Sequence, residues 1–339
     1  MKEIIEAIKK GYTGDNEKDT QYLLEQMDKY KDNQPVLKEI YKLLFELLPQ
    51  DLQNNFVRNI NTEKFAERLT EIQELVANKK YEKALNYLDM SIEHIDKVYE
   101  DDKYEYKTFH SPLEAYIYAK FRDDKTKIVK NAELDFGVFH KFRGIILYNL
   151  ERYEEAEKEF LESFKWNNLD FEAIFAYADT LFKMGRIEEF YKYNLEKIKT
   201  CFSNYGLATI YHNLGLYYLT KGTKDDDMLA FYLICYSISF AETEYAFKDL
   251  NTICEKYKMK KELAPEDVVF RALNKRNIPL APDPDLTKLL IDTARGFIGK
   301  NDEFALYTFK VIYSLTRDDI TLQYIKAGEK AIAAKRKEK

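Results

Sequence analysis

Apolar residues recur at helical spacing along most of this chain, and small residues interrupt them at a regular interval. Gly144 is followed twelve residues later by Ala156, and Thr293 is followed by Ala305 at the same interval. Small side chains at that separation let two antiparallel helices approach closely where they cross, while larger apolar side chains fill the space on either side. The pattern therefore predicts consecutive helical hairpins.

Two segments of the chain are near copies of each other. Residues 79–88 read KKYEKALNYL and residues 151–160 read ERYEEAEKEF, a separation of 72 residues. Self-similarity of this kind is typical of repeat proteins, in which each unit buries its apolar face against its neighbours. We expect an all-α fold of stacked helical hairpins.

The repeat resembles the tetratricopeptide repeat, a helix–turn–helix unit of about 34 residues. The small residues of that family match Gly144 and Ala156, its turn tyrosine matches Tyr153, and its aromatic residue in the second helix matches Phe160. In the next unit, Ala178, Gly185 and Phe190 take the corresponding places. The resemblance implies a right-handed α-α superhelix, a TPR-like solenoid of stacked hairpins that binds other proteins or peptides.

The chain departs from the family pattern in several places. His140 and Arg143 occupy positions that are usually apolar, and three extra residues around 225–227 are expected to lengthen a turn. We predict three regions in chain order: an N-terminal helical region, 1–62, packed on the solenoid; repeats over 63–316, with irregular units at 97–136 and 244–285; and a capping helix with a basic tail, 317–339.

The N-terminal region carries its own helix signals. Gly11 is expected to end a first helix, Asp15 or Asn16 to cap a second, and Pro35 to lie in the first turn of a third. Pro112 and Glu114 follow Ser111 in a further helix start, a capping box.

Charge and composition exclude several classes of function. Lysine and arginine total 53 against 59 acidic residues, which gives a net charge of −6. Because both signs are interleaved along the helices, the chain lacks the concentrated basic face that nucleic acids require. No stretch is apolar enough to span a membrane. Three widely spaced cysteines and an N-terminus without a secretory signal indicate a cytoplasmic protein with reduced thiols.

The motifs associated with catalysis and with metal or cofactor binding do not fit. The segment 296–300, GFIGK, has two residues between its glycines where a phosphate-binding loop needs four, so it is interpreted as a helix end with a turn. Residues 15–19 begin like a calcium loop but lack its glycine and closing glutamate. The four histidines form no i, i+4 pair. We therefore expect no enzyme activity, no metal and no cofactor.

The resemblance also places a candidate binding groove. In tetratricopeptide arrays the first helix of each unit lines a concave surface, and a mixed aromatic and polar lining suits an extended peptide or a partner helix. The alternative for each side chain is simple packing against neighbouring units. The positions that correspond to this lining are Lys141, Tyr148, Phe175, Asp179, Phe182, His212, Asn213 and Leu216.

Three hypotheses about function follow from the sequence. The first is a non-catalytic scaffold that binds a protein or peptide partner in this groove. The second is a peptide sensor or regulator of a bacterial signalling pathway, in which the repeats control the N-terminal helices. The third is an enzyme or metal protein supported by the solenoid, which we disfavour because no nucleophile–base pair or ligand set is visible.

Overall fold

The computed structural model describes residues 2–31, 33–49, 67–92, 101–132 and 134–337. Its backbone is mostly helical, and the chain divides into two compact units, Met1–Asp101 and Asp102–Lys339. The predicted region boundaries at 62/63 and 96/97 lie outside the described residues.

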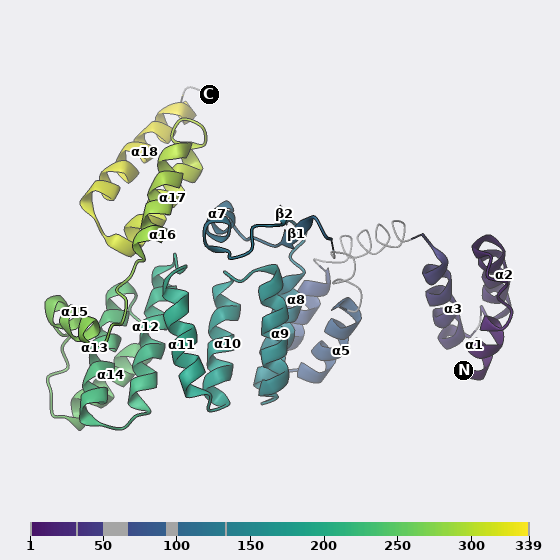
Figure 1. The fold of residues 1–339 in the computed structure, drawn as a ribbon, viewed down its shortest axis with the longest axis horizontal. Coiled ribbons are helices and arrows are strands. Elements are labelled where there is room, and N and C mark those ends of the chain that lie inside the picture. The colour runs from purple at the N-terminus through teal and green to yellow at the C-terminus, as the bar shows by residue number, and fades with distance from the viewer. Residues whose placement is uncertain (1, 32, 50–66, 93–100, 133, 338–339) are drawn as a thin grey trace. The chain divides into compact units, whose positions relative to one another are not determined.

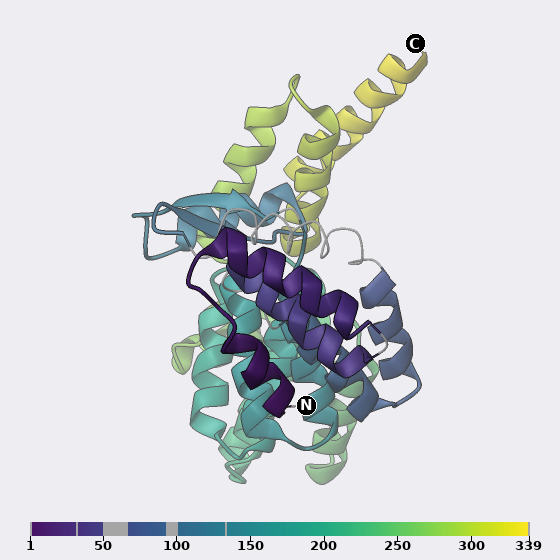
Figure 2. The same ribbon diagram turned by 90° about the vertical axis from the view of Figure 1, so that its right-hand side faces the viewer.

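The first unit begins with three helices packed around a small apolar core (Figure 2). They are α1 (Lys2–Lys9), α2 (Asn16–Lys29) and α3 (Gln34–Leu47). Asp15 caps α2 by accepting hydrogen bonds from two backbone amides, and Pro35 lies in the first turn of α3, as predicted. The core residues are Ile8, Leu23, Val36, Ile40 and Leu43.

A helical hairpin completes the described part of the first unit. Residues 67–77 are helical and α5 (Tyr81–Ile92) follows after a short turn. Ile72, Ala84 and Leu88 are fully buried. The apolar positions that the repeat pattern identified here therefore form the packed faces of these helices.

The second unit contains a series of helices in which most pack on the next along the chain (Figure 1). The strong contacts run from α8 to α14, α15 packs on α13, and α16 to α18 form a further set. In chain order the helices are α8 (Gly137–Asn149), α9 (Tyr153–Trp166), α10 (Phe171–Lys183), α11 (Ile187–Ile198), α12 (Asn204–Leu219), α13 (Lys224–Phe240), α14 (Glu244–Lys256), α15 (Glu266–Lys275), α16 (Pro284–Phe297), α17 (Asp302–Thr316) and α18 (Asp319–Lys337).

Small residues bring the paired helices together as the pattern predicted. A Cβ atom on Gly144 of α8 would lie 2.7 Å from the ring of Phe160 on α9. A Cβ on Gly215 of α12 would lie 3.0 Å from Ile234 on α13. Both distances are shorter than van der Waals contact, so a hydrogen atom in place of a methyl group is what allows these two hairpins to close.

Buried serines strengthen the same two hairpins at equivalent positions. Ser163 lies seven residues after Ala156 and donates a hydrogen bond to the carbonyl of Gly137 (3.1 Å). Ser237 lies seven residues after Ala230 and donates to the carbonyl of Ala208 (2.6 Å). The matching bonds show that α8–α9 and α12–α13 are built on one plan, although the second pair has longer helices.

Three hairpin turns share one backbone arrangement. The second residue after the first helix has a left-handed conformation: φ is 55° at Lys79, 60° at Glu151 and 72° at Gly185. In each turn the next amide donates to the carbonyl five residues earlier, a bond that satisfies an otherwise unpaired helix-terminal carbonyl. These bonds are Lys80 to Leu75 (2.8 Å), Arg152 to Leu147 (2.9 Å) and Arg186 to Leu181 (3.0 Å).

A short parallel sheet interrupts the otherwise helical chain, which differs from the prediction of helices alone. β1 (Tyr104–Lys107) pairs with β2 (Ile128–Asn131), and α7 (Pro112–Phe121) connects them. Ser111 caps α7 by accepting a hydrogen bond from the amide of Glu114, as predicted for a capping box. The Glu114 carboxylate, however, accepts from the amide of His110 and does not close the box.

The strand β1 and the residue after it supply hydrogen-bond donors to the C-terminal end of α9. The Lys107 ammonium donates to the carbonyl of Lys165 (2.6 Å), and the amide of Thr108 donates to the carbonyl of Trp166 (3.0 Å). Both acceptors lie in the last turn of α9, where carbonyls lack partners within the helix and a cation is favoured by the helix dipole. The segment therefore caps α9 from outside.

Two polar residues inside α8, His140 and Arg143, share one partner. The Nδ1 of His140 lies 2.9 Å from a carboxylate oxygen of Glu159 on α9, and the other oxygen accepts from Arg143. One carboxylate therefore accommodates both departures from the apolar family pattern.

One expectation about a turn was wrong. Asp225, Asp226 and Asp227 do not lengthen the turn but form the first turn of α13, which is capped by Thr223. Carboxylates are stabilised at this end of a helix by the dipole, so the extra residues extend the helix.

Candidate functional site

A row of polar and aromatic side chains crosses four helices of the second unit. It consists of Tyr148 on α8, Asp179 on α10, His212 on α12, and Tyr245 and Asp249 on α14; we call it the cross-helix row. Three of these residues, Tyr148, Asp179 and His212, were predicted as groove positions, and the structure brings them together.

The first two members are electrostatically coupled. Burial raises the pKa of the Tyr148 phenol above its ordinary value, and the nearby Asp179 carboxylate raises it further. The ring of Tyr148 also packs edge-on against Tyr153, the turn residue at the start of α9 (centroids 5.6 Å apart). Tyr148 thus packs within its own hairpin and interacts electrostatically with α10.

The other end of the row joins α12 to α14. His212 is 6% exposed, and its Nε2 lies 2.9 Å from a carboxylate oxygen of Asp249. Its ring meets that of Tyr245 at 4.7 Å in an edge-to-face arrangement. The Tyr245 hydroxyl is in turn 3.3 Å from that of Thr209. These contacts fix the imidazole ring in one orientation.

Asp179 is the accessible centre of the row. Its side chain is exposed to solvent, and it has no hydrogen-bond or ion-pair partner among the described residues. Protein atoms nevertheless crowd around the carboxyl: desolvation raises its pKa, while Lys183 and His212 act in the opposite direction. Asp179 is therefore an exposed carboxylate whose surroundings include protein groups from more than one helix.

Aromatic side chains flank Asp179 along α10. Phe175 lies one turn before Asp179 on the same helix face and is half-buried. It stacks on Phe171 (6.0 Å, 23°), which contacts Phe202 at 5.4 Å. The surface beside the carboxylate is therefore apolar and aromatic.

Lys141, another predicted groove residue, is engaged within the protein. It is 7% exposed, and its ammonium lies 3.0 Å from Asp170 and 2.7 Å from Glu172 at the start of α10. Desolvation lowers the Lys141 pKa, but the two carboxylates outweigh it and the net shift is upward. The lysine is thus charged and joins α8 to α10.

The remaining predicted positions take part mainly in packing. Phe182 contacts Phe190 on α11 edge-on at 5.1 Å, and Leu216 is half-buried. Asn213 is 4% exposed and donates to the side-chain oxygen of Asn194 at 3.0 Å. A role for these positions in binding stays a prediction.

Sequence reasoning missed the two members of the row on α14. Tyr245 lies 34 residues after Tyr211, and Asp249 lies 34 residues after Gly215, so the repeat period extends through α14. That continuation of the period was the available signal. It was obscured because residues 244–285 contain several prolines and were interpreted as one irregular unit.

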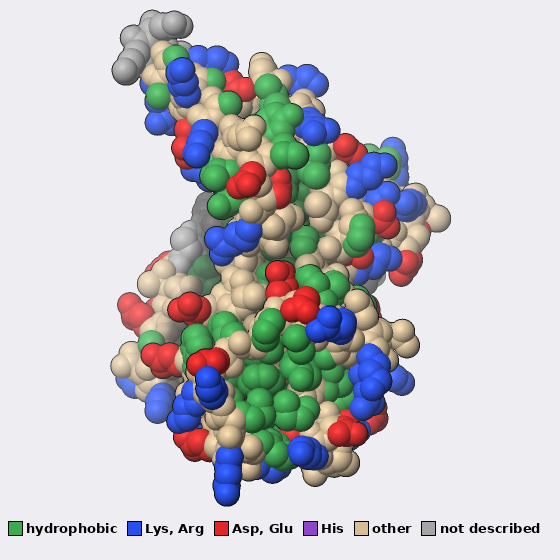
Figure 3. All heavy atoms as spheres, turned by 90° about the vertical axis from the view of Figure 1, so that its left-hand side faces the viewer, with side chains coloured by type: hydrophobic (Ala, Val, Ile, Leu, Met, Phe, Trp, Pro, Cys, Tyr) green, Lys and Arg blue, Asp and Glu red, His purple; other side chains and the backbone are tan. Residues whose placement is uncertain are grey.

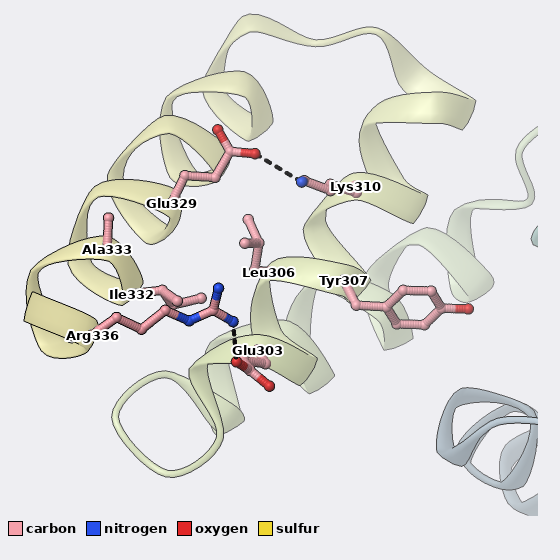
Figure 4. A pocket seen from close by; sticks show the side chains of 8 residues that line it. All are labelled: Glu303, Leu306, Tyr307, Lys310, Glu329, Ile332, Ala333 and Arg336. Atoms are coloured by element: carbon pink, nitrogen blue, oxygen red, sulfur yellow. Dashed lines mark hydrogen bonds and ion pairs between the residues drawn. The ribbon is translucent and has the colours of Figure 1, made fainter. Parts of the chain in front are cut away.

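Two other surfaces of the second unit have different characters. Figure 3 shows hydrophobic side chains gathered on the side of the molecule where α13, α14 and α15 lie. A shallow pocket between α17 and α18 has Leu306 and Ile332 on its floor, and the ion pairs Lys310–Glu329 and Glu303–Arg336 span it (Figure 4). In this pocket each charge already has a partner, unlike Asp179.

The described residues contain no group of three or more histidine, cysteine or acidic side chains placed to hold a metal ion. None of the helices in the described part of the chain has the length and apolarity needed to cross a membrane.

No protein-family model and no curated protein matches this sequence.

Proposed function

We propose that this protein is a non-catalytic scaffold of the tetratricopeptide type that binds a peptide or an extended protein segment. In this proposal the hairpins from α8 to α14 stack into a right-handed superhelix with the cross-helix row on its concave side. The recurring turns, the small residues at the helix crossings and the serine bonds at equivalent positions support the repeat architecture.

The cross-helix row is the observation that carries the proposal. It consists of aromatic and polar side chains from α8, α10, α12 and α14 that interact with one another. Aromatic anchors supply contact area at low entropic cost, and fixed polar groups set the register of an extended chain. An enzyme would need a nucleophile–base pair or a comparable set of reacting groups, and the row offers none.

Alanine variants of the row test the proposal. A random-peptide library displayed on phage is selected on the immobilised full-length protein, and enriched peptides are synthesised with a fluorophore. Phe175→Ala and Tyr148→Ala are each expected to weaken binding about tenfold, because truncation of a central aromatic contact typically costs about 1–2 kcal/mol. Anisotropy titration measures the dissociation constants.

The matched control is Leu161→Ala. Leu161 is an apolar residue of α9 that is 45% exposed and belongs to a second helix. Its variant should bind like the unmodified protein. Binding that survives both changes in the row, or that is lost only in the control, would place the partner on another surface.

A further inference from the structure

We infer that the cross-helix row contains a subsite for a cationic side chain, arginine or lysine, of the bound peptide, with Asp179 as its counter-ion. This inference rests on the proposed function and specifies the chemistry of the same surface. It starts from the position of one unpaired carboxylate among aromatic side chains and fixed polar groups.

The charges around the row favour a cation. The carboxylates in and near the row are Asp170, Glu172, Asp179 and Asp249. Lys141 is buried between the first two, and Asp249 accepts a hydrogen bond from His212. Only Asp179 has no partner among the described residues, so it is the carboxylate available to a ligand.

The surroundings of Asp179 also suit a cation. Phe175 lies one turn before it on α10, and the Tyr148 phenol on α8 interacts with it electrostatically. Aromatic faces attract ammonium and guanidinium groups and cover their apolar stems. A carboxylate that is partly desolvated gains more from an incoming cation than one fully surrounded by water. A guanidinium also matches a carboxylate with two parallel hydrogen bonds.

Lys183 is the competing cation of the protein itself. It lies one turn after Asp179 on α10 and lowers the pKa of the Asp179 carboxyl without forming an ion pair with it. A cationic group of the ligand would compete with this weak electrostatic interaction between Lys183 and Asp179. The inference therefore predicts opposite effects of changing these two residues, which a purely structural role for Asp179 does not.

The test compares peptide selection on the unmodified full-length protein and on Asp179→Asn. Asp179 is exposed and unpaired, so the variant is expected to fold normally. Peptides enriched on the unmodified protein should be rich in arginine or lysine at one position, and this preference should disappear on Asp179→Asn. Asp292→Asn, an exposed aspartate of α16, is the matched control and should keep the preference.

Synthetic peptides then measure the effect of charge alone. Replacing the selected arginine by citrulline, its neutral isostere, should weaken binding to the unmodified protein about tenfold or more and should have little effect on Asp179→Asn. Lys183→Gln should tighten binding of the arginine peptide. Added salt should weaken the arginine peptide more than the citrulline peptide.

The outcomes separate the two levels of the proposal. If peptides bind but citrulline replaces arginine without loss, or if Asp179→Asn keeps the basic preference, the cation subsite is wrong and the peptide scaffold stands. If no peptide is enriched on the unmodified protein, both are overturned.

Discussion

Replacing Gly144 by alanine tests the packing of the α8–α9 hairpin most directly. At a helix position with free space, replacing glycine by alanine stabilises the folded state by about 0.5–1 kcal/mol, because alanine loses less backbone entropy on folding. Here the new methyl carbon would lie 2.7 Å from Cε1, 2.9 Å from Cδ1 and 2.9 Å from Cζ of the Phe160 ring. Ordinary carbon contacts lie at about 3.5–4.0 Å, so the ring or the helices must move.

The Phe160 ring cannot move freely because it is fully buried. Overpacking of a close-packed site costs about 1–3 kcal/mol, which exceeds the gain from alanine. The net expectation is a destabilisation of the hairpin by about 0.5–2 kcal/mol. Gly215→Ala should cost less, since its nearest contact would be 3.0 Å, to a carbon of Ile234.

Gly296 provides the control for helix propensity. It lies in α16, and a Cβ there would have no heavy atom within 4 Å. Gly296→Ala should therefore be neutral or stabilise by up to about 1 kcal/mol. From most to least stable, the expected order is Gly296→Ala, the unmodified protein, Gly215→Ala and Gly144→Ala.

Hydrogen exchange measured by mass spectrometry is the appropriate assay, because a chain with two units has no single unfolding free energy. Peptides from α8 and α9 should exchange about 2- to 30-fold faster in Gly144→Ala, as the free-energy range implies. Phe160→Leu should partly restore protection in the same background. Unchanged or slower exchange in Gly144→Ala would refute the close-packing argument.

Three further predictions concern buried groups. Ser163→Ala and Ser237→Ala should each cost about 1 kcal/mol in local exchange experiments, since each removes one buried hydrogen bond, and clearly unequal losses would contradict their structural equivalence. Desolvation raises the pKa of Asp227, but hydrogen bonds from Lys256 and a tyrosine outweigh it and the net shift is downward. The ionised Asp227 carboxylate therefore stabilises α13–α14 at pH values above its unfolded pKa, and this stabilisation is lost as the pH falls through its folded pKa. Asp227→Asn should remove this pH-dependent part of the stability, which hydrogen exchange at several pH values would measure. Burial raises the pKa of Cys201 to about 12. Its thiol should therefore react with maleimide only after unfolding, and rapid labelling of the native protein would contradict this burial.

Local patterns in the sequence predicted the helical hairpins because those patterns act over short distances. The spacing from Gly144 to Ala156 depends on a single helix crossing, and the cap at Asp15 depends on two neighbouring amides. The strand pair was missed because Tyr104–Lys107 has only four residues, and its parallel partner lies beyond an intervening helix. Such pairing is determined by distant contacts that a short pattern does not contain.

The candidate site was predicted in part for a similar reason. Asp179 and His212 were identified because the repeat pattern places them at corresponding positions on successive first helices, which line one surface. The burial of Lys141 depends on carboxylates at the start of α10, and the inward position of Asn213 depends on Asn194. A one-residue difference in helix rotation changes such contacts, and rotation is set by packing between helices.

The shared turn has a consequence for how this chain can change in length. Arg152 and Arg186 occupy the same place in two turns, 34 residues apart, and each forms an ion pair with the glutamate three residues later. Deleting residues 153–186 would join Arg152 directly to the helix that normally follows Arg186, and the two turns have the same backbone arrangement. Duplicating these residues would insert one complete unit bounded by the same turn at each end. Arrays of this kind are therefore expected to gain or lose whole units by recombination. Insertions or deletions of other lengths would disrupt the turn.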